Sequence, residues 1–278
     1  MLKTRVITAF FLLFAFLGVL FYLPITGWVM FATLVAAIAG WEWGALMRSG
    51  GTARLLLGVA VAAACAGVAV LDPAALGIDP GFSSAAWPLG RWFYIPAALF
   101  WILIVPVWMK RRWSLPRGPL GMAIGALLIM PTWLALVQLR EAGGMALLGI
   151  MALVWLADIA AYFFGRTFGK HKLAPSISPG KTWEGAVGAG FTVLVYGFVL
   201  ASHLPSALAG KHVLLFAVLL LLTAVSIIGD LFESLLKRQA GLKDSSNILP
   251  GHGGVLDRID SLTSTLPLVT LVWLISLH

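Results

Sequence analysis

The sequence predicts an all-α, polytopic integral membrane protein with about nine transmembrane helices. Of its 278 residues, 60% are hydrophobic and only 11% are charged, whereas soluble domains carry about 25% charged residues. The apolar residues form runs long enough to cross a bilayer, which takes about 20 residues of helix. Only helices and closed barrels satisfy their backbone groups in lipid, and these runs are too long and too uniformly apolar for barrel strands.

Nine apolar runs are candidate transmembrane helices. The first is long for a signal peptide, lacks a small-residue cleavage site and leads directly into the second, so we expect it to be retained. The fourth is the weakest, and the segment before it, Asp72 to Arg91, is rich in Pro and Gly and is predicted to be a loop or partly re-entrant. The candidates are 6–23, 25–47, 55–71, 93–109, 119–139, 143–165, 184–204, 212–236 and 260–277.

The positive charges predict the orientation of the chain, because loops rich in Lys and Arg stay on the cytoplasmic side. With the N-terminus inside and an odd number of spans, 16 of the 19 Lys and Arg residues fall in inner loops, and the outer loops hold only Arg91, Arg140 and Lys211. We therefore expect a multi-pass protein of the inner (cytoplasmic) membrane with its C-terminus in the periplasm. This bias accounts for the net charge of +8, so no nucleic-acid partner is predicted.

Two smaller features have ordinary explanations. The single cysteine, Cys65, lies in an apolar run, where it cannot form an internal disulfide and is expected to act as a small core residue. The basic loop 110–117 (KRRWSLPR) suits both the topology and contact with anionic headgroups. The alternative for this loop is that it gathers an anionic lipid substrate.

Polar residues concentrate in a downstream polar segment, 230–261. Its first part places carboxylates, a hydroxyl and an amine at i, i+3, i+4 and i+7 on one helical face: Asp230, Glu233, Ser234 and Lys237. Asp257, Asp260 and Ser261 repeat the i, i+3, i+4 spacing. Between these two groups lie more charges and the Gly-His-Gly-Gly turn of residues 251–254.

The residue types in this segment suit one chemistry. Carboxylates are ligands for hard divalent cations, Lys and Arg bind polyphosphates, and glycines let the backbone approach a ligand closely. Together they predict a metal-assisted phosphate-transfer site. The alternative is a solvated loop between two helices, with Asp257 as an ordinary N-terminal cap.

An upstream polar segment, 158–184, has a similar composition. Asp158 lies inside an apolar run, with Tyr162 one turn later on the same face, and an intramembrane carboxylate is a functional hypothesis by default. Glycines, cations and small hydroxyls follow as far as Glu184. They predict a second phosphate-binding segment on the same side of the membrane; the alternative is a basic inner loop capped by Thr182.

The spacing of the downstream segment resembles the motif of the phosphatidate cytidylyltransferase family (CDP-diacylglycerol synthases). The match extends over 27 positions, through Ser234, Lys237, Arg238, Lys243, Asp244, Leu249, Pro250, His252, Gly253, Gly254, Asp257, Arg258 and Asp260. The upstream segment is similar to a second block of that family, through Asp158, Tyr162, Gly165, Arg166, Gly169, Lys170, Ser178, Pro179, Lys181, Thr182, Trp183 and Glu184. The resemblance covers about 155–261, the C-terminal half.

The resemblance implies that CTP and phosphatidic acid, held at the lipid bilayer, give CDP-diacylglycerol and pyrophosphate. It implies Mg²⁺, for which the expected ligands are Asp230, Asp244, Asp257 and Asp260, and it leaves room for a second, monovalent cation. The expected catalytic residues are Lys243, Asp244, Asp257, Arg258 and Asp260. The expected substrate-binding residues are Arg166, Lys170, Ser178, Lys181, Thr182, Ser234, Lys237, Arg238, His252, Gly253 and Gly254. The attacking lipid phosphate is already an anion, so His252 is expected to be structural or to contact phosphate rather than to act as a base.

Two other functions remain as alternatives. A CTP-dependent lipid kinase would transfer the γ-phosphate instead. An ion-coupled transporter would use Asp158 and Asp230 as a cation path, although the polar residues cluster at one membrane face. We expect two parts, residues 1–140 without a readable motif and a catalytic part, 141–278, and a homodimer is a further expectation.

Overall fold

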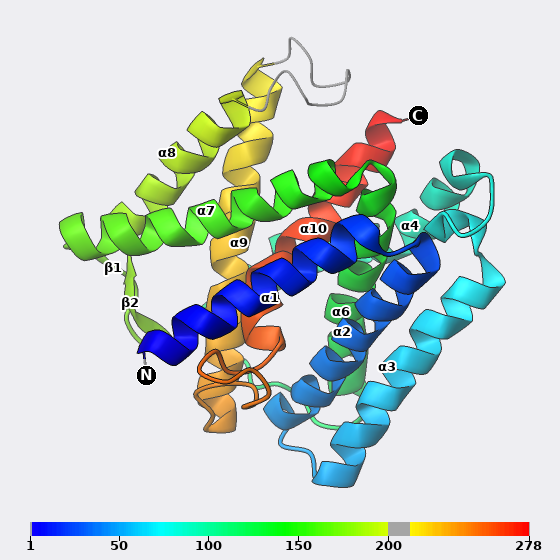
Figure 1. Cartoon of the computed structure of the whole chain (residues 1–278). Coiled ribbons are helices and arrows are strands. Elements are labelled where there is room, and N and C mark those ends of the chain that lie inside the picture. Colours follow the sequence, from blue (N-terminus) through cyan, green and yellow to red (C-terminus); the bar gives the residue numbers. More distant parts are fainter. Residues whose placement is uncertain (1, 200–211, 278) are drawn as a thin grey trace.

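The computed structural model describes residues 2–199 and 212–277, with side chains for 8–199 and 213–277, and it is almost entirely helical (Figure 1). The helices are α1 (Leu2–Tyr22), α2 (Ile25–Leu46), α3 (Gly51–Leu71), η1 (Ala74–Leu76), α4 (Phe82–Leu99), η2 (Phe100–Ile104), α5 (Val105–Arg111), α6 (Pro119–Glu141), α7 (Gly144–Phe168), α8 (Trp183–Val199), α9 (His212–Ala240) and α10 (Leu256–Ser276). The strands are β1 (Lys172–Ala174) and β2 (Ser178–Thr182).

The predicted class, an all-α polytopic membrane protein, is confirmed. Within the described ranges, seven helical segments are long and apolar enough to cross a membrane, and α8 and the described part of α1 are shorter apolar helices. Each of the nine predicted runs overlaps one of these segments. The last part of the predicted span 184–204 and the predicted outer residue Lys211 lie outside the described residues.

The prediction that 72–91 is a loop or a re-entrant segment was wrong in its second half. The short 3-10 helix η1 and a left-handed Gly77 follow α3, but α4 already begins at Phe82, eleven residues before the predicted span. Pro88 and Pro96 lie inside α4, and the helix continues through the π-helical η2 into α5. Membrane helices tolerate proline because neighbouring helices and local π adjustments satisfy the freed backbone groups.

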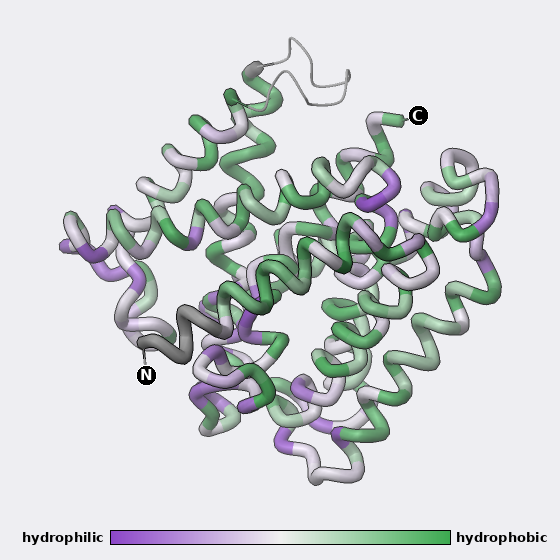
Figure 2. The backbone as a smooth tube through the Cα atoms, in the orientation of Figure 1, coloured by the Kyte–Doolittle hydropathy of each residue, from purple (hydrophilic) through white to green (hydrophobic). Residues whose placement is uncertain are grey.

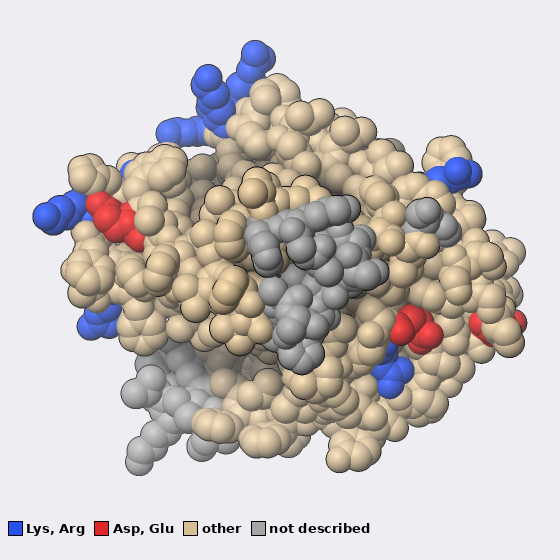
Figure 3. All heavy atoms as spheres, turned by 90° about the horizontal axis from the view of Figure 1, so that it is seen from above, with Lys and Arg blue, Asp and Glu red and all other residues tan. Residues whose placement is uncertain are grey.

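The helices form two groups around α9 and α10. Figure 1 shows α2, α3, α4 and α6 on one side of this pair and α8 and the β1–β2 hairpin on the other, while α7 crosses from one side to the other. Helix α10 packs on α9, α4 and α6, while α8 packs on α7 and α9. Hydrophilic residues gather at the helix ends, above all where the hairpin and the α9–α10 loop lie (Figure 2). Figure 3 views the molecule from above, and on the described surface seen there the charged side chains are scattered near the edge.

Aromatic side chains fill the core between the two groups. The ring of Phe232 on α9 meets Phe100, Trp101 and Trp108 edge to face, with centroids 5.5–6.1 Å apart. Two buried indole N–H groups of α2 find acceptors on α6: Trp28 donates to the carbonyl oxygen of Leu136 at 3.0 Å and Trp43 to that of Gly121 at 2.9 Å. These contacts hold α9, which carries half of the downstream polar segment, against the N-terminal helices.

A buried amide network braces the segment before α4. Gln138, on α6, is fully buried. Its Nε2 donates to the carbonyl oxygens of Ala75 (2.9 Å) and Ala86 (3.3 Å), and its Oε1 accepts from the Tyr94 hydroxyl (2.8 Å). One side chain thus joins α4, η1 and α6 at the end of the molecule away from the hairpin.

We expect Gln138→Leu to destabilise the protein, because it leaves buried polar groups of this network without partners. The loss should be about 1–3 kcal/mol, measured by thermal unfolding in detergent. Ser84→Ala removes an exposed hydrogen bond near the same segment and should change stability by less than about 0.5 kcal/mol. Equal stability of the two variants would contradict this account of the network.

Candidate active site

A cavity of about 800 Å³ lies where the hairpin, α7, α8, α9 and α10 meet. Both polar segments line it, so the structure brings together residues more than 70 positions apart in the sequence. Basic and acidic residues are equal in number among those that line the cavity. The basic residues are Arg166, Lys172, Lys181, Lys237 and Arg258, and the acidic residues are Asp158, Asp230, Asp244, Asp257 and Asp260.

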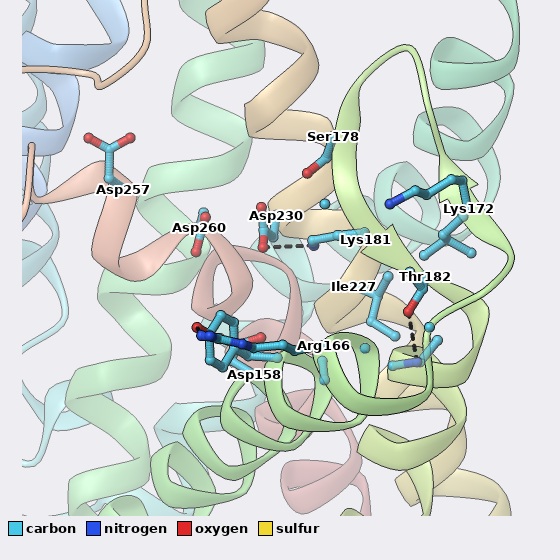
Figure 4. A pocket seen from close by; sticks show the side chains of 18 of the residues that line it. Asp158, Arg166, Lys172, Ser178, Lys181, Thr182, Ile227, Asp230, Asp257 and Asp260 are labelled. Carbon is cyan, nitrogen blue, oxygen red and sulfur yellow. Dashed lines mark hydrogen bonds and ion pairs between the residues drawn. The ribbon is translucent and has the colours of Figure 1, made fainter.

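An ion pair joins the two polar segments directly. Lys181, on β2, places its Nζ 2.7 Å from Oδ2 of Asp230 on α9 (Figure 4). The other carboxylate oxygen of Asp230 accepts the hydroxyl of Ser234 at 3.2 Å. These contacts hold the strand over the cavity and orient Asp230.

The hairpin that carries Lys181 was not predicted, although the whole upstream segment was singled out. Strands β1 and β2 pair antiparallel, with Lys172 opposite Thr182 and Ala174 opposite Ser178. Their sequences, KLA and SPGKT, lack the alternation of polar and apolar residues that marks a strand. The backbone therefore turns over the cavity through a structure that the sequence pattern does not reveal.

Contacts at its ends fix the hairpin to the helices. Nη2 of Arg112, in the basic loop, donates to the Ser176 hydroxyl at 2.7 Å. Nδ1 of His171 lies 2.7 Å from Oε1 of Glu184 in the first turn of α8. Helices α7 and α8 approach closely beside it, since a Cβ added at Gly185 would lie 2.6 Å from the carbonyl oxygen of Ala161.

Asp257 is the centre of the α9–α10 loop. Its Oδ1 lies 2.6 Å from Nζ of Lys237. Its Oδ2 accepts the backbone N–H and the hydroxyl of Ser245 and the N–H of Gly254, all within 2.9 Å. Four donors thus occupy this carboxylate, and Figure 4 shows it directed away from the other labelled aspartates.

Three other carboxylates face one another across the cavity. Figure 4 shows Asp158 from α7, Asp230 from α9 and Asp260 from α10 near one another among the lining residues. They are close enough to repel one another. Glu233 lies beside Asp260, with its Oε1 3.4 Å from Nζ of Lys237. This concentration of negative charge is favourable only if cations approach it.

The chemistry of these donors fits a hard divalent cation. In the described part of the chain, no three His, Cys, Asp or Glu side chains are grouped so as to hold a metal ion by themselves. Magnesium rarely needs such a cage, because it is usually bound by one or two carboxylates together with substrate phosphates. Asp158, Asp230 and Asp260 are therefore candidates to supply one or two ligands alongside substrate phosphates. Asp230 has one partner on each oxygen, whereas Asp257 already accepts from four donors.

The predicted site residues divide into those that line the cavity and those that surround it. The lining includes Arg166, Ser178, Lys181, Thr182, Asp230, Lys237, Asp244, Asp257, Arg258 and Asp260. The remaining predicted residues are absent from the lining: Lys170, Ser234, Arg238, Lys243, His252, Gly253 and Gly254. Among these, Gly253 (φ +82°) forms the turn before α10.

Three residues of interest were not among the predicted site residues. Asp158 was singled out as an intramembrane carboxylate but not as a metal ligand, and it lines the cavity from α7. Lys172 lines the cavity from β1, and its place in a basic run gave the only sequence signal. Glu42, on α2, is fully buried and contacts the α9–α10 loop. It is the first acidic residue of the chain, and its position inside an apolar run was a signal that sequence reasoning overlooked.

Comparison with known proteins identifies the family. The model of the cytidylyltransferase family matches residues 3–276. The chain belongs to the cytidylyltransferase family. The family model extends over the N-terminal helices as well as the two polar segments, whereas the resemblance read from the motifs covered only about 155–261.

Curated members of the family resemble the chain closely. A phosphatidate cytidylyltransferase of Pseudomonas aeruginosa is 42% identical over 283 residues, which cover 98% of this chain and 97% of the relative. An enzyme of the same name from Haemophilus influenzae is 53% identical over 44% of this chain and 43% of its own. A Staphylococcus saprophyticus protein of that name is 44% identical over 49% of this chain and 52% of its own.

The geometry of Asp257 predicts a stability effect. Asp257→Asn removes the charge that faces Lys237. It also replaces one accepting oxygen with an NH₂ donor, although the neighbouring N–H groups of Ser245 and Gly254 need an acceptor. Breaking such a buried pair should lower the free energy of unfolding by about 3–5 kcal/mol, measured by thermal unfolding in detergent. The exposed Asp244 serves as the control, since Asp244→Asn should cost less than about 0.5 kcal/mol. A similar loss in both variants would refute the proposed anchoring by Asp257.

Proposed function

We propose that the protein is a membrane-embedded phosphatidate cytidylyltransferase, which converts CTP and phosphatidic acid into CDP-diacylglycerol and pyrophosphate for phospholipid biosynthesis. The observation that carries the proposal is the meeting of both polar segments in one cavity, through Lys181 and Asp230, in a chain of this family. The named relative that covers nearly the whole chain supports the same activity.

The reaction requires two anions to meet. An oxygen of the lipid phosphate attacks the α-phosphorus of CTP, the bond from that phosphorus to the bridging oxygen of the β-phosphate breaks, and pyrophosphate leaves with the bonding electron pair. Positioning and charge stabilisation supply most of the catalysis in such a transfer. Lys181, Arg258 and Lys172 line the cavity and would hold the phosphate oxygens in line.

Mg²⁺ is part of the proposal, and one or two of the carboxylates of Asp158, Asp230 and Asp260 would hold it together with substrate phosphates. When bound, it would act as a Lewis acid at the α-phosphate and offset the charge that develops on the leaving pyrophosphate. The charges of the lining support it, because five basic and five acidic residues leave the cavity without the net positive charge that a triphosphate and a lipid phosphate require.

The lipid substrate would reach the cavity from the bilayer. Asp158, Tyr162 and Ile227 line the cavity from the apolar helices α7 and α9. The acyl chains can therefore stay among lipid while the phosphate enters the polar site. This arrangement explains why an enzyme for a water-soluble nucleotide consists mostly of apolar helices.

We expect the purified protein to form CDP-diacylglycerol from phosphatidic acid and CTP labelled at the α-phosphorus. A chelator of divalent cations should abolish this product, and added Mg²⁺ should restore it. Asp260→Asn, prepared identically, should be inactive and controls for contaminating host enzyme. Transfer of label from the γ-phosphorus to lipid, with release of CDP, would instead establish the kinase alternative.

We further propose that the cavity opens to the cytoplasm of the cell, where CTP is present, in the inner membrane. The support is the excess of basic residues at the helix ends around the cavity. Residues of the hairpin, the basic loop and the α9–α10 loop all belong to this end of the molecule (Figures 1 and 2).

Labelling of introduced cysteines tests this orientation. In intact spheroplasts, a membrane-impermeant maleimide should react with Ala142→Cys, in the exposed turn between α6 and α7, but not with Asn247→Cys, in the exposed α9–α10 loop. Permeabilisation should make Asn247→Cys reactive. The native Cys65 is buried and gives a low background. The opposite labelling pattern would reverse the proposed orientation.

A further inference from the structure

Glu42 is the one acidic residue of α2, and it lies far along the chain from both polar segments. Its side chain is fully buried and does not line the cavity. Burying a carboxylate among apolar helices is unfavourable unless several donors compensate it. The donors that Glu42 finds show which part of the molecule this residue serves.

All of its hydrogen bonds come from the α9–α10 loop and the start of α10. Oε1 accepts the Ser246 hydroxyl at 2.6 Å and the N–H of Val255 at 2.9 Å, and Oε2 accepts the N–H of Leu256 at 2.6 Å. The sequence separations exceed 200 residues. A residue of the N-terminal half therefore fixes the middle and the C-terminal end of the loop that carries Asp244.

Glu42 caps the N-terminus of α10, which has no side-chain cap of its own. The first N–H groups of a helix lack intrahelical partners and favour a negative charge beside them. The N-cap residue of α10, Val255, provides no side-chain cap. The carboxylate of Glu42 supplies these acceptors from another helix and so sets where α10 begins, at Leu256, immediately before Asp257 and Arg258.

The loop is shaped around this carboxylate. A Cβ added at Gly254 would lie 2.3 Å from Oε1 of Glu42 and 2.1 Å from the Ser245 hydroxyl oxygen. The N–H of Gly254 and both donors of Ser245 bind Asp257 from the other side. Glu42 and Asp257 therefore clamp one short stretch of backbone between them.

We infer that Glu42 is a positioning residue of the active site, which holds the α9–α10 loop so that Asp244, Asp257 and Arg258 face the cavity. The effect on turnover rests on the function proposed above; the effect on the loop does not. The inference also assigns a role to the N-terminal helices, in which no motif was found.

The test combines hydrogen exchange of the substrate-free protein with steady-state kinetics. Glu42→Gln keeps the shape of the side chain but replaces one accepting oxygen with an NH₂ group. That group is itself a donor and cannot accept from the loop N–H or hydroxyl groups. We expect exchange of the Val255 and Leu256 amides to become about tenfold faster or more. At saturating CTP, kcat should fall at least about tenfold, because small displacements of positioned groups cost up to about 100-fold.

Gln138→Leu is the matched control, because Gln138 is equally buried and braces backbone at the far end of the molecule. It should lower the Tm while leaving exchange of residues 244–258 and kcat per folded molecule within about twofold of the parent. Ser246→Ala, at a partly exposed position, tests the clamp if Glu42→Gln does not fold. It should speed exchange of the same loop about two- to tenfold.

Unchanged exchange of the loop in Glu42→Gln, or in Ser246→Ala where Glu42→Gln cannot be purified, would overturn the inference. The inference would also be overturned if kcat fell in both Glu42→Gln and Gln138→Leu in proportion to the fall in Tm of each variant. If the parent protein forms no CDP-diacylglycerol, the proposed function fails, and the exchange rates still decide whether Glu42 holds the loop.

Discussion

The ion pair between Lys181 and Asp230 is the interaction on which the architecture of the site depends. Charged groups among apolar helices are stable only when they meet partners inside the protein. Lys181 on the hairpin and Asp230 on α9 satisfy each other at 2.7 Å. The strand must therefore lie over α9, and the cavity is the space enclosed between this strand, α7 and α10.

The distribution of charge inside the cavity follows from its paired and clustered groups. Lys181 is engaged with Asp230, and Lys237 with Asp257 and Glu233. Asp158 and Asp260 add further negative charge beside Asp230. One region of the cavity is thus acidic and suited to a cation, while Lys172 and Arg258 lie among the lining residues suited to phosphate. A metal-bound polyphosphate needs both kinds of surface in contact.

The sequence was sufficient to predict what local patterns encode. Long apolar runs gave the helices, and the dense polar motifs gave most residues of the cavity lining. The start of α4 was missed because the Pro and Gly residues of Asp72 to Arg91, Pro88 among them, indicated a loop, although packing in a membrane tolerates proline inside a helix. The sequence did not show that the Asp257 oxygens accept hydrogen bonds from within the protein. Lys237, Ser245 and Gly254 become its donors only when the loop folds.

The N-terminal helices show why the absence of a motif is weak support for the absence of a role. A cavity that binds two anions needs many polar residues, and these must cluster, so they form a visible motif. Holding a loop in place by hydrogen bonds needs only one buried acceptor at the right position along one helix. Glu42 meets that need with a single side chain, surrounded in the sequence by residues that encode nothing except a helix in lipid. In the loop it contacts, Leu242 packs against the hydrophobic core, and hydrogen bonds from α2 and from within the loop further restrict the backbone. The α9–α10 loop therefore takes part of its support from α2, and the geometry of the cavity is a property of the whole helix assembly.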